Sequence, residues 1–592
     1  MRIKDIFVIV LCVLLGAAFL IAAQRQIGGI HNARQQMGLV ANAPLENAPP
    51  SLAFATVAMG AFRGLVVNIL WMRADNLKME GKFFDARQLA EWITTLQPRF
   101  AAVWDFHAWN MAYNISVAIP NTQPEERWRW VRNGYELLRD RAIPLNPKSI
   151  LLYRSLAWIF QHKIGDIADD CNRYYKKEIA MGMRSILGER PDHALFDRLA
   201  AAPRTLDQAL ADPQVAQFIA DLQQADAVFA DRTKLVSHYL SLRQNPARFD
   251  KKAFEVIDFW RDKPALAAFD TFARAEKLRS EWKFDIDFMI ELNRRYGAVN
   301  PVNSEQTYPL NWEHPAAHAI YWAALGLKKA GRPEQYRIDE KNTDRIVFHS
   351  LQMLYRSGRV VLYEEPEQGT SVFLLPDLRM FDVCDRFWLE IIKKYEEFEG
   401  GNPKAVRGGH KNFLENALVM FYQAGHTAKA AQIYRRLQTE YEFDEQGFVR
   451  NEYKVPMMTF IRNALKEELQ SLGLTDAVEF IMSVLRESYF RYALREDDEA
   501  AGRENLAKEV YEIYQKEMGL EEAQRVGLPS MDRLRYAALM GFLEDEMYPE
   551  TMRINLLSRI QIERPDLFER LRQQESQVFE EIQKQQQQQQ QK

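Results

Sequence analysis

Residues 67–98 carry small and apolar side chains at helical spacing on both sides of a glycine, and this pattern predicts two short helices packed as a hairpin. The positions concerned are Leu70, Ala74, Leu77, Ala86, Leu89, Ala90 and Ile93. Gly81 separates the two predicted helices, and Pro98 ends the second. The small side chains of Ala74 and Ala86 let the helices approach closely, so a hairpin of this kind constrains the fold strongly.

Later segments repeat parts of this pattern, namely residues 147–180, 317–331 and 411–442. The last of them matches best, through Ala417, Phe421, Gly425, Ala430, Tyr434 and Leu437. It departs from the pattern at Leu418, where a small residue is expected, and at Glu442, where proline is expected. Together the segments resemble the tetratricopeptide repeat, a helical hairpin with a small residue in its first helix, a glycine turn, an alanine in its second helix and a final proline.

This resemblance implies an all-α solenoid whose stacked hairpins expose an extended surface to protein or peptide partners. The stretches LAWIFQHKIGD and LNWEHPAAHAIYWAALGLKKAG also resemble a group of uncharacterised membrane-anchored repeat proteins of bacteria. That group has no established activity, so the resemblance implies a fold and no chemistry. The residues alone leave one alternative open, a generic helical bundle in which alanine and glycine coincide with the repeat pattern by chance.

Composition agrees with a helical protein and excludes several functional classes. The 592 residues contain only 27 glycines, which argues against an all-β chain with frequent special turns. The net charge of −4 provides no basic field, so we expect no nucleic acid partner. The three cysteines, Cys12, Cys171 and Cys384, are far apart and predict neither a disulfide framework nor a zinc site. The common phosphate-binding, hydrolase and zinc-protease motifs are absent from the sequence, so we expect no cofactor and favour a non-enzyme.

An uninterrupted apolar run from Ile6 to Ala23 predicts a single membrane-spanning helix. Its 18 residues would span about 27 Å as a helix, close to the thickness of a bilayer core. A cleaved signal peptide is the alternative, although Ile21 would then occupy a position that usually holds a small residue. Arg2 and Lys4 slightly favour a cytoplasmic N-terminus, which would place most of the chain outside the cytoplasm, in the periplasm.

The sequence thus predicts an all-α chain with an N-terminal transmembrane helix, a solenoid of repeat-like hairpins and a helical insertion. The expected parts are an anchor or signal at 1–24, a linker at 25–60, N-terminal repeats at 61–184, an insertion at 185–300, a second repeat block at 301–445, a C-terminal helical region at 446–570 and a glutamine-rich tail at 571–592.

Two neighbouring segments supply the candidate partner-binding residues. The aromatic segment WDFHAWNMAY contributes Trp104, His107, Trp109 and Asn110, and the basic segment ERWRWVRNGYELLRDR contributes Arg129 and Arg132. In a repeat array such side chains can line a groove for a peptide. The competing interpretation is packing, because aromatic stripes usually belong to a core and the apolar residues of the basic segment fall on one helical face.

Other polar clusters are weaker candidates. His314 and His318 would share one face of a helix, but no third metal ligand is evident in the sequence. Asp166, Asp169 and Asp170 fit no calcium-binding loop and are typical of a helix start. We therefore expect a membrane-anchored scaffold for protein–protein interactions. The alternative is an envelope enzyme or glycan-binding protein that uses the face around residues 104–141, which a deep pocket with several titratable groups would favour.

Overall fold

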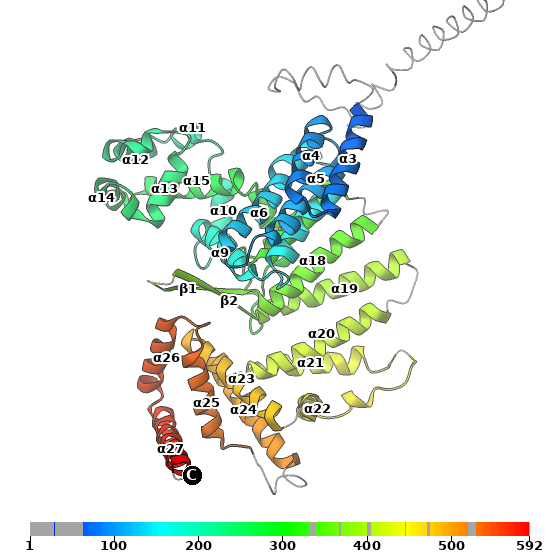
Figure 1. The fold of residues 1–592 in the computed structure, drawn as a ribbon, viewed down its shortest axis with the longest axis vertical. Helices are drawn as coiled ribbons and strands as arrows, with labels where there is room; N and C mark the ends of the chain where they lie inside the picture. The colour runs from blue at the N-terminus through cyan, green and yellow to red at the C-terminus, as the bar shows by residue number, and fades with distance from the viewer. Residues whose placement is uncertain are drawn as a thin grey trace, which may run out of the picture. The chain divides into compact units, whose positions relative to one another are not determined.

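A computed structural model describes Gly29 and residues 63–331, 338–365, 369–399, 404–444, 446–470, 474–518 and 528–590. Apart from one β-hairpin and two isolated bridges, the regular structure of these residues is helical, which confirms the predicted α fold (Figure 1). The predicted anchor at 6–23 and the linker lie outside the described residues. Among the helices that are described, none has the length and apolar character needed to cross a bilayer.

The chain divides into two compact units, and the first comprises Met1–Cys171 and Trp322–Thr343. Its described α-helices are α3 (Arg63–Met79), α4 (Phe83–Leu96), α5 (Ala101–Trp109), α6 (Pro124–Glu136), α7 (Ile143–Leu145) and α8 (Ile150–Trp158). Helices α17 (Pro315–Ala330) and α18 (Ile338–Ser357) each have residues in both units.

The second unit comprises Asn172–Tyr321 and Asp344–Lys592. Its first helices are α9 (Asn172–Leu187), α10 (His193–Ala201), α11 (Leu206–Ala209), α12 (Pro213–Ala225), α13 (Leu235–Gln244), α14 (Lys251–Trp260), α15 (Pro264–Ser280) and α16 (Ile286–Tyr296). The later elements are β1 (Arg359–Glu365), β2 (Gly369–Leu375), α19 (Phe381–Glu399), α20 (Lys404–Gln423), α21 (Thr427–Glu440), α22 (Met457–Gln470), α23 (Leu474–Ala493), α24 (Asp497–Met518), α25 (Met531–Glu544), α26 (Glu550–Glu563) and α27 (Pro565–Gln590).

Helices α3 and α4 form the hairpin that the sequence predicts around Gly81. Gly81 has φ +75°, a left-handed conformation that glycine adopts without the steric cost of a side chain. Ala74 of α3 and Ala86 of α4 are both completely buried. The predicted role of these two alanines as close-packing positions is therefore confirmed.

Two hairpins of the second unit share this turn geometry. Gly425, between α20 and α21, has φ +81°, and Ala430 is buried five residues later. Arg495, between α23 and α24, has φ +61°, and Ala500 is buried at the equivalent distance. The same turn therefore recurs with an arginine in the place of the glycine.

Three helices of the first unit end in π-helical segments, which the sequence analysis does not predict. These segments are η3 (Asn110–Ile115) after α5, η5 (Leu137–Ala142) after α6 and η6 (Ile159–Ile164) after α8. Widened turns of this kind are uncommon and are found often at functional sites.

Strands β1 and β2 form an antiparallel hairpin in which Val360 pairs with Leu374 and Leu362 with Val372. Val360 and Val372 pack against Ala180 of α9 in one apolar cluster. The helical interpretation of the sequence did not predict this hairpin.

Residues 209–273, within the predicted insertion, share an apolar core of their own. Its large members include Phe218, Tyr239 and Phe269, whose rings meet edge to face. Edge-to-face contacts place the positive ring edge over a negative ring face, so they stabilise this core beyond simple burial.

Candidate functional site

The described part of the second unit contains a cavity of about 880 Å³. Several segments far apart in the sequence line it: the end of α9, the loop 298–313, β1, the segment 376–380, the α20–α21 turn and the α23–α24 turn. Its charged lining residues are Arg184, Glu189, Arg190, Glu313, Arg359, Asp377, Arg379, Arg491, Glu496, Glu499 and Arg503. Apolar side chains lie between them, including Val302, Leu310, Leu354, Val360, Met380, Met420 and Leu494.

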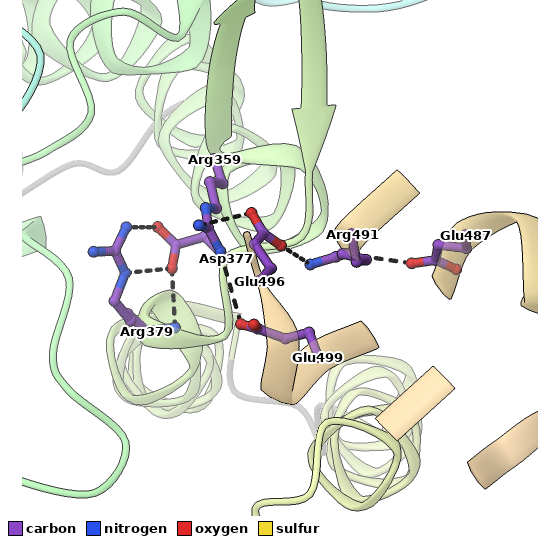
Figure 2. Close-up of polar contacts among 7 residues, drawn as sticks. All are labelled: Arg359, Asp377, Arg379, Glu487, Arg491, Glu496 and Glu499. Atoms are coloured by element: carbon purple, nitrogen blue, oxygen red, sulfur yellow. Dashed lines mark hydrogen bonds and ion pairs between the residues drawn. The ribbon is translucent and has the colours of Figure 1, made fainter. Parts of the chain in front are cut away.

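A chain of alternating charges crosses one wall of the cavity (Figure 2). Arg359 of β1 reaches Glu496 at 2.7 Å and Glu499 at 3.7 Å. The other oxygen of Glu496 contacts Arg491 at 2.9 Å. The side chains of Glu496 and Arg491 are only 3% and 5% exposed, so this pair is removed from solvent almost completely. The chain therefore connects the β-hairpin with the α23–α24 turn.

The charges continue from this wall into the α23–α24 hairpin. Glu487 lies 3.3 Å from Arg491 and 3.2 Å from Arg503. Arg503 also donates a hydrogen bond of 2.9 Å to the side-chain oxygen of Gln423 at the end of α20. Gly502 permits this close approach, because a Cβ there would lie 2.2 Å from the carbonyl oxygen of Gln423. The charged hairpin and the preceding hairpin are therefore joined at the cavity.

Local geometry fixes Glu496 in this position. Arg495 adopts φ +61°, which is unfavourable for a residue with a side chain. The backbone N–H of Glu496 donates to the carbonyl oxygen of Arg491, and the N–H of Arg495 donates to that of Tyr492. These bonds close the end of α23, and the turn directs the Glu496 carboxylate back toward Arg491.

Burial raises the pKa of Glu496, although the charges of Arg359 and Arg491 act in the opposite direction. Burial likewise lowers the pKa of Arg503, against the attraction of Glu487. Both shifts disfavour the charged forms, so the burial of this ionic cluster has an electrostatic cost.

Two further arginine–carboxylate pairs line the cavity. Arg379 donates to both oxygens of Asp377 at 2.8 Å, and Arg184 donates to both oxygens of Glu313 at 2.7 Å. The hydrogen bonds to Glu313 raise the pKa of Arg184. Burial raises the pKa of Glu313, against the opposing effect of Arg184. These bidentate contacts keep the side chains in a fixed orientation around the cavity.

Most of the carboxylates that line the cavity are paired with arginines. Asp377, Glu313 and Glu496 are each held by an arginine. Glu189 and Arg190 are exposed, and within the described residues neither forms an ion pair. No group of histidine, cysteine or acidic side chains in the described part of the chain has the arrangement of a metal site. The cavity thus offers fixed charges of both signs, separated by apolar surface.

Three of the six residues predicted from the sequence as partner-binding are buried. Trp104 donates from its indole nitrogen to the carbonyl oxygen of Pro98 at 2.8 Å. The side-chain amide of Asn110 donates to the carbonyl oxygen of Phe83 at 2.8 Å. His107, which lies between these two residues in the sequence, is also buried, and neither of its ring nitrogens has a hydrogen-bond partner among the described residues. In this structure the three side chains support packing and present no surface to a partner.

The other three predicted residues are exposed. Trp109 is 40% exposed and stacks on Tyr113, with ring centroids 4.0 Å apart. Arg129 and Arg132 are exposed on α6, and Arg129 pairs with Glu126 at 2.6 Å. Whether these residues bind a partner stays a prediction.

A second stacked pair lies on η6 and the end of α8, where the rings of Trp158 and His162 are 4.8 Å apart. His162 also contacts Tyr113 with a centroid distance of 5.9 Å. The two stacked pairs, Trp109–Tyr113 and Trp158–His162, are called the aromatic ladder below. This ladder combines one predicted residue with three that the sequence analysis did not select.

The weaker sequence candidates have structural roles. His314 accepts a hydrogen bond from the backbone N–H of Ala316 at the start of α17, and burial lowers its pKa to about 3. His318 is bonded to the carbonyl oxygen of Trp312. Asp169 is buried between Lys163 at 2.5 Å and Arg127 at 3.1 Å. Each of these three residues therefore has a polar partner within the fold, and Asp169 belongs to a buried ion-pair cluster.

Sequence reasoning selected none of the cavity residues. The signal that could have found them is the charge pattern of α23 and α24, where Glu487, Arg491 and Arg503 occupy inward-facing helical positions. No protein-family model matches this chain, and a search of curated proteins finds no significantly similar sequence.

Proposed function

We propose that this protein is a membrane-anchored helical-repeat scaffold of the cell envelope, and that the cavity of its second unit binds a segment of another protein. The observation that carries the proposal is the lining itself, in which oriented arginine–carboxylate pairs alternate with apolar side chains. A polypeptide segment offers the matching chemistry, namely apolar side chains, charges of both signs and backbone hydrogen-bonding groups.

The size and charge of the cavity support this ligand class. A volume of about 880 Å³ is near the upper end for small-molecule sites, so several residues of an extended segment would fit. The described lining contains six arginines and five carboxylates, so the cavity has no strong excess of one charge that would select a small anion or cation.

The scaffold and its location rest on separate arguments. The turns at Gly81, Gly425 and Arg495 support hairpins of the tetratricopeptide-like kind, which commonly bind protein segments. The apolar run at 6–23 supports a membrane anchor with the bulk of the chain outside the cytoplasm. A binding role is also favoured over catalysis, because the buried carboxylates of the cavity are held by arginines.

Photo-crosslinking in intact membranes tests the proposal. Val302 lines the cavity and is 80% exposed, so a photo-reactive amino acid can be placed there without disturbing the core. Val228, exposed on the insertion, is the control position. We expect a discrete protein adduct from position 302 and none from position 228.

A pair of arginine variants locates the binding determinant. Arg359→Ala removes the charge that orients Glu496 and Glu499, and it should reduce the adduct at position 302 at least tenfold. Arg232→Ala removes an exposed arginine paired with Asp207 outside the cavity, and it should leave the adduct unchanged. Equal adduct yields in the two variants would contradict a binding site in the cavity.

The aromatic ladder supports a second candidate function, glycan binding in the first unit. Stacked rings suit sugar faces, and Trp109 is exposed while the other three rings of the ladder are half-buried. The ladder rests on η3 and η6, two of the uncommon π-helical segments. Trp109→Ala should abolish binding of envelope glycan fragments, whereas Trp92→Ala, an exposed tryptophan on α4 outside the ladder, should not. Unchanged glycan binding in Trp109→Ala would exclude the ladder as the site.

A further inference from the structure

A second cavity of the second unit, with a volume of about 590 Å³, lies along one face of α20 and is called the α20 cavity below. The α20 residues that line it follow one another at helical spacing: Gly409, Asn412, Phe413, Asn416, Val419 and Met420. The other helices contribute Gln352, Tyr355 and Arg356 from α18, Trp388 from α19 and Ala464 from α22. Among the described residues, only Met420 also lines the cavity proposed above as the partner site.

Two buried side chains of the α20 cavity carry hydrogen-bond donors without acceptors. Tyr355 and Trp388 are 3% and 8% exposed. Neither the Tyr355 hydroxyl nor the Trp388 indole nitrogen has a hydrogen-bond partner among the described residues. Burial raises the pKa of Tyr355, so its hydroxyl keeps the proton that it can donate. A buried polar group without a partner is destabilising, and a bound acceptor would remove that cost.

The packing of the two rings keeps both donors at the same wall of the cavity. Each ring contacts Phe413 of α20, with centroid distances of 5.4 Å from Tyr355 and 6.5 Å from Trp388. Gly409 makes room for the indole, because a Cβ there would lie 2.6 Å from the Trp388 ring. A glycine inside a helix costs about 1 kcal/mol relative to alanine. The indole is therefore held at this wall at a cost to the stability of α20.

The remaining lining residues give the α20 cavity a positive charge and an apolar surface. Arg356 is exposed and forms no ion pair within the described residues. Asn412 and Asn416, also exposed, add amide groups, and Val419 and Met420 add apolar surface. No carboxylate belongs to the part of the lining that the structure describes. Donors and a positive charge beside apolar surface suit an anionic hydrogen-bond acceptor with an apolar body.

We propose that the α20 cavity binds a small carboxylic acid with an apolar body, in its carboxylate form. The carboxylate accepts hydrogen bonds from the Tyr355 hydroxyl and the Trp388 indole N–H, and Arg356 balances its charge. The volume of about 590 Å³ lies within the range of small-molecule sites, so the body of the acid can lie against the apolar surface of α20.

Ligand-observed NMR on the purified full-length chain tests the proposal with 3-phenylpropionate as the probe. This acid combines an aromatic body with one carboxylate, and 3-phenylpropanamide has the same body without the charge. We expect saturable binding of the acid with a Kd in the millimolar range or tighter, as for other ligands of about ten non-hydrogen atoms. The amide should bind about tenfold more weakly or less, because it lacks the charge-assisted hydrogen bonds.

Variants of the two donors show whether they contact the acid. Tyr355→Phe and Trp388→Phe each remove one donor and keep an aromatic ring, and each should raise the Kd of 3-phenylpropionate about tenfold or more. Tyr355→Phe should leave the unfolding temperature unchanged or higher, since no hydrogen bond is lost. The matched control is Tyr489→Phe, outside the cavity, where the hydroxyl donates to the carbonyl oxygen of Arg535 at 3.2 Å. The control should lower the unfolding temperature and leave the Kd unchanged.

A third pair of variants tests the charge. Arg356→Gln should reduce the preference for the acid over the amide about threefold or more, because the positive charge of the lining is removed. Arg435→Gln, at an exposed position of α21 outside the cavity, should leave this preference unchanged.

Three results would overturn the proposal. Absence of saturable binding, or equal affinity for the acid and the amide, would exclude a carboxylate site. Equal Kd values in the parent chain, Tyr355→Phe and Trp388→Phe would show that the two donors do not contact the acid. A loss of stability in Tyr355→Phe as large as that in Tyr489→Phe would show that a buried water already satisfies the hydroxyl. Binding of the acid needs no protein partner, so the adduct at Val302 is an independent measurement.

Discussion

The hairpins α20–α21 and α23–α24 have the same turn but differ in the side chains around it. When Gly425 is aligned with Arg495, the buried apolar residues Phe421 and Ile433 correspond to Arg491 and Arg503. Ala417 and His426 correspond in the same way to Glu487 and Glu496. Both hairpins have buried apolar residues, but α23–α24 also has a network of buried and partly buried charges at these four positions.

The difference suggests that the charges of α23–α24 contribute little to the stability of the fold and more to the choice of a ligand. Buried ion pairs often contribute less to stability than apolar side chains of similar volume, because desolvation offsets their attraction. The raised pKa of Glu496 and the lowered pKa of Arg503, both caused by burial, have the direction that this cost predicts. A charged interior next to a cavity fits the recognition role that we propose, since fixed charges discriminate between ligands.

The largest effect is expected from breaking the network on one side only. Arg491→Ala leaves Glu496 buried with a single remaining ion pair, to Arg359, and leaves Glu487 with Arg503 alone. We expect a loss of about 3–5 kcal/mol in the free energy of unfolding, because the charge of Glu496 stays in a site removed from solvent after one of its two arginine partners is lost. Urea unfolding measures the change, and a loss below about 1 kcal/mol would mean that water reaches Glu496.

His107 is a buried polar side chain that, among the described residues, has no hydrogen-bond partner. Burial lowers the pKa of His107 to about 4, and the charges of Arg87 and Arg141 act in the same direction. The folded pKa thus lies below the unfolded value of 6.5, so stability is retained above pH 6.5 and lost as the pH falls toward 4. The difference corresponds to about 3 kcal/mol at most.

His107→Leu should remove this acid sensitivity. The variant has no ring nitrogens to bury, so at pH 7 its stability should equal or exceed that of the parent chain. Unfolding midpoints measured between pH 7 and pH 4 should fall less steeply for the variant than for the parent. Parallel curves for the two proteins would show that His107 does not titrate in a buried position.

Replacing the four charged residues of α23–α24 by their counterparts in the α20–α21 hairpin tests whether the charges serve stability or partner binding. A chain with Glu487→Ala, Arg491→Phe, Glu496→His and Arg503→Ile carries in α23–α24 the residues of α20–α21. We expect its stability to be unchanged or higher by about 1–4 kcal/mol, since apolar side chains replace three of the four charged residues. Capture of a partner at Val302 should nevertheless fall at least tenfold. A chain that unfolds more easily would show that the network also stabilises this hairpin.

Sequence reasoning succeeded where structure is local. The α3–α4 hairpin could be predicted because Ala74, Gly81 and Ala86 determine its packing and its turn within one short segment. The cavity could not be predicted, because its lining comes from segments that are far apart in the sequence, such as those of Arg184 and Arg503. Proximity of this kind depends on packing between hairpins, which helical periodicity does not report.

Two other features were missed for identifiable reasons. The run RVVLYEE and the run TSVFLL are rich in β-branched and aromatic residues, so strands β1 and β2 could have been recognised from composition. The burial of Trp104 and Asn110 agrees with the competing packing interpretation, because the sequence of an aromatic helix does not show which of its faces packs against a neighbouring helix.

The smallest effect concerns the turn that the two hairpins share. Arg495→Gly relieves the left-handed backbone of its side-chain clash, which costs about 1–2 kcal/mol, but it also adds freedom to the unfolded chain that costs up to about 1 kcal/mol. A net gain of about 0.5–1 kcal/mol in the free energy of unfolding is therefore expected.

Gly425→Ala makes the reverse change at the matching turn. A Cβ at Gly425 would meet no atom within 4 Å, so backbone strain alone should destabilise that hairpin by a similar amount. Because Arg495→Gly leaves the contacts of Glu496 with Arg359 and Arg491 in place, capture at Val302 should not change. Urea midpoints that move in opposite directions for the two variants would establish that the turns are equivalent, and that only the side chains inside the hairpins distinguish them. A loss of capture in Arg495→Gly at unchanged stability would instead show that the strained turn itself positions the Glu496 carboxylate.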